Sequence, residues 1–235
     1  MASYLLIHGA FRGAWMWDRL IRELRSLGHR GIAVELPNAG SKWREDHPQV
    51  SMTDYTDAVL QAAKTMADPI LVGHSQGGVV ARVAAERSPE SFSAIAYLDA
   101  PIPEDGLRAI DLQPPSWEDR TIPELGPDVL VPPLPLEPGP DLSAEDAEWM
   151  NAMVTPQPVL PSLETLHFAD EDAAALPTHV AFCSATPEIY PCWRTRSAMD
   201  TAGEPYTLLD GPHDIAVTDP VAVAGWLSSV IQPVE

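Results

Sequence analysis

Cysteine is almost absent from this chain, which has only Cys183 and Cys192 among its 235 residues. The two thiols form no CxxC motif, and no histidine lies near either at the spacing of a metal-ligand pair, so zinc and iron–sulfur sites lack local ligands. We do not expect a disulfide between them, because a reducing compartment keeps thiols reduced. The sequence therefore predicts no metal site and no cofactor.

Basic residues are also scarce, since Lys and Arg total 14 against 34 Asp and Glu, a formal net charge of -20. This excess of negative charge repels nucleic-acid phosphates and anionic lipids. No stretch approaches the roughly 20 consecutive apolar residues that cross a bilayer, and the N-terminus lacks the regions of a signal peptide. We expect a cytoplasmic monomer or homodimer with a small-molecule substrate and neither nucleic-acid nor membrane partners.

Apolar runs that read as buried strands alternate with segments of helical period. Such alternation predicts a mostly parallel sheet with helices on both faces and right-handed crossovers. Ser51 and Asp54 form a capping-box pattern at the start of one helix. The predicted strands are 4–7, 31–36, 69–73, 94–98, 178–183 and 206–209, and the predicted helices are 15–27, 51–66, 76–87, 193–202 and 220–231.

The alternation breaks in a proline-rich stretch, which holds 14 of the chain's 25 prolines between Pro101 and Pro161. Only residues 143–153 look helical there. A loop this long within a compact domain is usually functional or disordered, and its apolar content is too high for a linker. We therefore expect a cap at 101–165, inserted after the strand that ends near Asp99, and a core formed by 1–100 and 166–235.

The sequence GHSQG at 73–77 fits G-x-S-x-G between a predicted strand and a predicted helix, the context of a nucleophile elbow. Ser75 is the candidate nucleophile. A serine hydroxyl needs a base, and His213 lies between the final predicted strand and the last helix, where such a base belongs in chain order. The backbone N–H groups of Ala10 and Gln76 are the candidate oxyanion donors.

These segments resemble a known family. LLIHGAFRGAWMW at 5–17, GHSQGG at 73–78, and Pro220 after His213 are similar to the α/β-hydrolase branch of plant methylesterases, hydroxynitrile lyases and bacterial esterase-like relatives. The resemblance covers both ends of the chain and skips the proline-rich stretch. It implies a six-stranded α/β-hydrolase core, a small cap and a Ser-His-acid triad.

The chain departs from this pattern in two places. The lyases carry a lysine shortly after the catalytic histidine, whereas Asp214 follows here, which argues against cyanohydrin cleavage. The family's acid is expected after strand 178–183, where Thr186 is the nearest equivalent. Two carboxylates remain as candidates, Asp99 at a strand end and Glu188 in that loop, and we favour Asp99.

The leading hypothesis is a carboxylesterase-like serine hydrolase that acts on a small, largely apolar ester, lactone or thioester through an acyl-enzyme. The alternatives are a lyase reaction on the same scaffold and a ligand-binding protein whose triad has decayed, because fold alone cannot choose among them. The candidate substrate-binding residues are Phe11, His74, Trp117 and Trp149.

Overall fold

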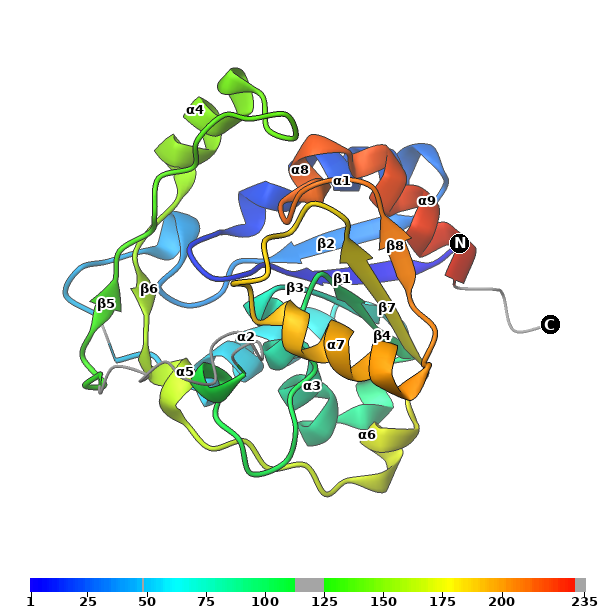
Figure 1. Ribbon diagram of the computed structural model, residues 1–235. Helices are drawn as coiled ribbons and strands as arrows, with labels where there is room; N and C mark the ends of the chain where they lie inside the picture. The colour runs from blue at the N-terminus through cyan, green and yellow to red at the C-terminus, as the bar shows by residue number, and fades with distance from the viewer. Residues whose placement is uncertain (48, 113–124, 231–235) are drawn as a thin grey trace.

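The computed structural model describes residues 1–47, 49–112 and 125–230 (Figure 1). Its centre is a six-stranded sheet in the order β2-β1-β3-β4-β7-β8, with every neighbouring pair parallel. The strands are β1 (Ser3–Ile7), β2 (Arg30–Val34), β3 (Ile70–His74), β4 (Ala94–Leu98), β7 (Thr178–Cys183) and β8 (Thr207–Leu209). The predicted six-stranded sheet is confirmed.

Helices cover both faces of the sheet, as Figure 1 shows. Because strand side chains alternate, Tyr4 and Leu6 of β1 face one helical layer while Leu5 and Ile7 face the other. The first layer contains α1 (Asp18–Ser26), α8 (Ile215–Thr218) and α9 (Pro220–Val230), and the second contains α2 (Met52–Ala63), α3 (Gln76–Arg87) and α7 (Cys192–Ala202). Both layers are needed to bury the apolar strands.

Local signals fixed several boundaries. The capping box is present at α2, where the Ser51 side chain accepts the Asp54 N–H and the Asp54 carboxylate accepts the Ser51 N–H. Asp170 caps α6 (Glu171–Ala175) in a similar way. The short 3-10 turns are η1 (Ala14–Trp17), η2 (Gly40–Lys42), η3 (Pro89–Ser91) and η4 (Ala109–Asp111).

Residues 101–165 are called the insertion below, and the structure describes 101–112 and 125–165 of them. β5 (Leu130–Val131) and β6 (Gln157–Pro158) pair as an antiparallel ribbon, flanked by α4 (Ala144–Met153) and α5 (Leu160–Leu163). In Figure 1 the ribbon and α4 lie on the side toward which β1 and β2 run. This is the edge where ligands bind in open parallel sheets. None of the helices in the described ranges is long and apolar enough to span a membrane.

Candidate active site

Ser75 occupies a sharp turn between β3 and α3. Its backbone has φ 52° and ψ −126°, a strained conformation for a residue with a side chain. Glycines allow the turn to close, because a Cβ at Gly73 would lie 2.5 Å from the Cα of Gly78, and one at Gly77 would collide with the carbonyl oxygen of Ile7. The structure therefore gives Ser75 the geometry of a nucleophile elbow.

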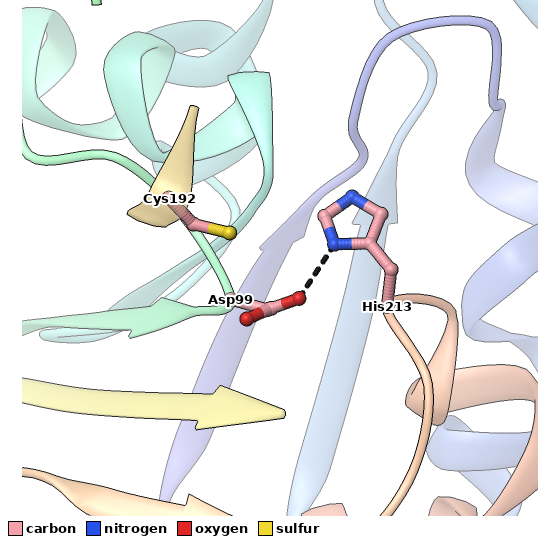
Figure 2. Close-up of side chains that lie close together, drawn as sticks. All are labelled: Asp99, Cys192 and His213. Carbon is pink, nitrogen blue, oxygen red and sulfur yellow. Dashed lines mark hydrogen bonds and ion pairs between the residues drawn. The ribbon is translucent and has the colours of Figure 1, made fainter. Parts of the chain in front are cut away.

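A candidate acid and the candidate base meet at the ends of β4 and β8. Figure 2 shows the hydrogen bond between His213 and Asp99. Nδ1 of His213 lies 2.6 Å from Oδ2 of Asp99, and both side chains are buried. His213 lies in the loop after β8, and Asp99 directly follows β4 with φ 47°. Glu188, the other candidate acid, is exposed in the loop after β7.

The Asp99 carboxylate has two further hydrogen bonds. The Cys183 N–H donates to Oδ1 at 3.0 Å, and the buried Thr186 hydroxyl donates to Oδ2 at 2.5 Å. Burial alone would raise the pKa of Asp99, but the hydrogen bonds from His213, Thr186 and Cys183 outweigh it and hold the pKa below the ordinary value. The carboxylate is therefore ionised and can accept the His213 N–H.

Cys192 lies on the other side of this carboxylate (Figure 2). Its Sγ, a carboxylate oxygen of Asp99 and a ring nitrogen of His213 all lie within 4.8 Å of one another. Thiolate, imidazole and carboxylate are zinc ligands, but here Asp99 and His213 already bond each other, and burial raises the pKa of the Cys192 thiol. An ion would have to replace the Asp99–His213 hydrogen bond, so the absence of a metal stays a prediction.

The loop after β1 lies against Ser75. A Cβ added at Gly9 would approach the Ser75 Cβ to 2.8 Å, which places the following Ala10 beside the elbow. The N–H groups of Ala10 and Gln76 have no hydrogen-bond partner among the residues that the structure describes. Two N–H donors from the β1 loop and the start of α3 are the arrangement that an oxyanion hole requires.

The insertion holds this loop in place. The Phe11 N–H donates to Oε1 of Gln157 at 3.1 Å, and the Phe11 carbonyl accepts the Thr155 N–H at 3.1 Å. Nε2 of Gln157 donates to the Tyr55 hydroxyl at 2.9 Å, which fixes the orientation of the amide. Phe11 itself is half-buried and has φ 64°. No local sequence pattern indicates Gln157, because its partners are distant in the chain.

His74 has a different place from the one expected. It is 1% exposed, its Nε2 lies 2.8 Å from the His213 carbonyl oxygen, and its ring lies 4.4 Å from the His213 ring. Burial, together with the nearby His213, lowers the pKa of His74 to about 3, so the ring is neutral. A neutral buried ring that bonds the His213 backbone lends no support to a substrate contact at His74, which stays a prediction.

Trp149 is also placed differently. Its indole packs edge-on against Trp15 at a centroid distance of 5.1 Å, and the Arg19 guanidinium lies 5.3 Å from its ring. Arg19 also pairs with Asp146 of α4. These contacts place Trp149 in the packing of α4 against η1 and α1, and its role as a substrate contact stays a prediction. Trp117 lies outside the described residues.

Two features of the site were missed from the sequence. The Tyr190 ring, from the segment after β7, lies 4.3 Å from the His213 ring. Arg12 forms a buried bidentate ion pair with Asp214, with Nε 2.9 Å from Oδ1 and Nη2 2.8 Å from Oδ2. The two partners are 202 residues apart, and the sequence contains no pattern that joins them.

Comparisons with known proteins show what this chain is similar to. Methyl jasmonate esterase 1 of Vitis vinifera is 35% identical over 103 residues, which are 43% of this chain and 40% of that protein. Alpha-hydroxynitrile lyase of Arabidopsis thaliana is 33% identical over 104 residues, 43% of this chain and 40% of that protein. The matched segment thus spans less than half the length of these relatives.

A solved structure is similar along nearly the whole chain. The crystal structure of polyneuridine aldehyde esterase matches with a TM-score of 0.78 and 20% identity, over 98% of this chain and 99% of that one. The family described as the alpha/beta hydrolase family matches residues 4–226. The predicted fold and the resemblance to the methylesterase and hydroxynitrile lyase branch are confirmed, and the chain belongs to the alpha/beta hydrolase family.

Proposed function

We propose that the protein is a serine hydrolase that cleaves a carboxylic ester, lactone or thioester through an acyl-enzyme. The single observation that carries this proposal is the buried 2.6 Å hydrogen bond between Asp99 and His213. The strained elbow at Ser75 is joined to the same strand end, because the Ser75 N–H donates to the carbonyl of Leu98, the residue before Asp99. An ionised carboxylate on Nδ1 leaves the other ring nitrogen of His213 as the proton acceptor. The esterase named among the relatives supports the same reaction class.

In this mechanism Ser75 Oγ attacks the carbonyl carbon while His213 takes its proton. The negative charge that develops on the carbonyl oxygen is stabilised by the Ala10 and Gln76 N–H groups. His213 then protonates the leaving alkoxide or thiolate, and an acyl-Ser75 remains. Water, deprotonated by His213, hydrolyses this ester and restores the serine.

Asp99 is the acid in this proposal because its Oδ2 bonds Nδ1 of His213, whereas Glu188 is exposed. The chain order is then Ser75, Asp99, His213, the order of nucleophile, acid and histidine in α/β-hydrolases. Asp99 keeps the imidazole in one tautomer and stabilises the imidazolium that forms.

The insertion, residues 101–165, is the proposed cap. Its Gln157 and Thr155 bond the loop after β1, so the cap and the proposed oxyanion hole share contacts. Its apolar residues favour a small, largely apolar substrate, and the net charge of -20 disfavours polyanions. Phe11, beside Ala10 and half-buried, is the proposed substrate contact.

A lyase reaction is the alternative, because a hydroxynitrile lyase is among the relatives. There His213 would act as a base and no acyl-enzyme would form. The lyases that the sequence resembles carry a lysine close after the catalytic histidine. Here Asp214 occupies that stretch and pairs with Arg12, so a cation that could hold a leaving cyanide is missing from that position.

The test is intact-mass analysis after incubation with a fluorophosphonate, which reads nucleophile activation without a known substrate. We expect a single adduct on the wild type that Ser75→Ala and His213→Ala abolish, with Ser93→Ala, a serine bonded to the Asp68 carbonyl, as the control. Asp99→Asn should slow labelling while Glu188→Gln should not. A folded wild type without an adduct would favour a decayed ligand-binding site, and turnover without a trappable acyl-Ser75 would favour the lyase.

A further inference from the structure

We propose that the buried ion pair between Arg12 and Asp214 holds the oxyanion loop against the loop of the general base, which makes both residues positioning residues for ester hydrolysis. This inference rests on the proposed function, because it assigns the pair a role in that reaction. It adds two residues that the Ser-His-Asp arrangement does not contain.

Arg12 and Asp214 lie close in the chain to two residues of the proposed site. Arg12 is two residues after Ala10, and Asp214 directly follows His213. The guanidinium makes two hydrogen bonds, of 2.9 and 2.8 Å, and each residue is 7% exposed. A bidentate Arg–carboxylate pair fixes both the distance and the relative orientation of its partners. The pair therefore sets where the proposed oxyanion donor lies relative to the base.

Each loop is also anchored to its own surroundings. The Ala14 N–H donates to Glu35 Oε1 at 2.8 Å, and the Phe11 N–H donates to Gln157. On the other side, the Asp214 carbonyl accepts the Val217 N–H at 2.8 Å in the first turn of α8. Each loop is thus anchored on its own side, and the Arg12–Asp214 bonds join the two loops directly.

The charges of the pair face the base. Burial alone would raise the pKa of Asp214, but the Arg12 guanidinium outweighs it and, helped by His213 and His74, holds the pKa of the carboxyl below its ordinary value. Both ions are therefore present and neutralise each other beside His213. The other titratable groups around His213 are Asp99 after β4, His74 at the end of β3, and Tyr190 and Cys192 after β7.

Loss of Arg12 leaves the negative charge of Asp214 unpaired next to His213. Loss of Asp214 leaves the positive charge of Arg12 unpaired there. An uncompensated Asp214 carboxylate stabilises the imidazolium, so Arg12→Met should move the acid limb of the kcat/KM–pH profile to higher pH. An uncompensated Arg12 destabilises the imidazolium, so Asp214→Asn should move the same limb to lower pH. Opposite movements of about one pH unit are expected from a charge this close. These movements report the charges beside His213, whereas a loss of kcat with little change in KM reports the positioning.

The experiment measures p-nitrophenyl butyrate hydrolysis across pH for wild type, Arg12→Met, Asp214→Asn and the double variant, with circular dichroism to confirm folding. The control is Arg87→Met, which removes a 2.8 Å ion pair to Asp57 at the far end of α3, about 18 Å along the helix from Ser75. We expect the single variants to lose 10- to 100-fold in kcat, roughly the cost of a 1 Å misplacement, with KM changed less than about threefold.

Opposite movements of the acid limb, with the double variant returning near the wild-type position, support the proposal. Should Arg12→Met fail to fold, the movement in Asp214→Asn and its reversal in the double variant decide. Folded variants with wild-type kcat, or with limbs that move in the same direction, overturn it. A wild type that neither hydrolyses the ester nor reacts with a fluorophosphonate overturns the proposed function itself. The positioning role of Arg12 and Asp214 then falls with it.

Discussion

The hydroxyl of Thr186 donates to Oδ2 of Asp99, the same oxygen that bonds Nδ1 of His213. Thr186 is the position nearest to the one where the resembled family carries its acid. The two positions available for a triad acid, the end of β4 and the loop after β7, therefore converge on one point beside His213. In this chain the carboxylate comes from β4, and the loop after β7 supplies a hydroxyl that supports it.

This convergence predicts that the acid can be moved. Asp99→Asn should lower kcat/KM by about 10³- to 10⁴-fold, because the amide favours the wrong tautomer of the imidazole. Asp99→Asn combined with Thr186→Asp should recover at least about tenfold of that loss, since the new carboxylate starts from a side chain already bonded to Oδ2. Ester hydrolysis measures both. A Glu188→Gln variant with the same loss as Asp99→Asn would instead identify Glu188 as the acid.

The Gln157 amide gives a second prediction, for the contribution of the insertion to catalysis. Gln157→Ala leaves the Phe11 N–H without its partner and frees the loop that carries Ala10. We expect kcat to fall by about 10- to 100-fold, because oxyanion donors act only when they are held in place, with a smaller change in KM. Stability should fall by about 1–3 kcal/mol through the unpaired buried groups.

The matched control for Gln157 is Asn151→Ala. The Asn151 side chain also bonds backbone groups of the insertion, since it accepts the Leu136 N–H and donates to the Leu136 carbonyl. It should destabilise the insertion without lowering kcat. Equal losses of kcat in the two variants would show that general loosening of the insertion, and not the bond to Phe11, controls the rate.

Trp149 gives a prediction that separates packing from substrate binding. Trp149→Ala should lower the free energy of unfolding by about 1.5–3 kcal/mol, because the indole packs against Trp15 and Arg19. The same variant should change kcat/KM less than about threefold. Urea denaturation and ester hydrolysis measure the two effects. A large rise in KM in a stably folded variant would support Trp149 as a substrate contact.

The sequence predicted the sheet well because its central strands β1, β3 and β4 are buried on both faces and read as continuous apolar runs. Residues 178–183 and 94–98 match β7 and β4 to the residue. The ribbon β5–β6 and helix α8 were not predicted, because elements of two to four residues are too short to show a period. In the site, GHSQG marked Ser75 locally, but Asp99 and His213 are 114 residues apart, so the sequence left two candidate acids open. In the structure Asp99 bonds His213, whereas Glu188 is exposed.

The buried neutral ring of His74 leads to a prediction about stability and pH. Nε2 of His74 lies against the His213 carbonyl oxygen and so carries the proton, while Nδ1 has no partner among the described residues. Protonation would add a second N–H in a site that cannot solvate it. Burial lowers the pKa of this ring from 6.5 to about 3, so below pH 6.5 the unfolded chain binds a proton that the folded chain does not.

Falling pH therefore favours the unfolded state and lowers the free energy of unfolding. Between about pH 7 and about pH 5, His74 should remove about 2 kcal/mol from the free energy of unfolding. His74→Gln keeps an N–H donor for the His213 carbonyl and cannot titrate, so its stability should fall less steeply, with buried His8 supplying part of the remaining slope. The exposed His167, changed to Gln, is the control and should leave the wild-type slope. Urea denaturation at both pH values measures how the free energy of unfolding changes with pH. The same change in His74→Gln as in the wild type would mean that burial does not hold His74 neutral.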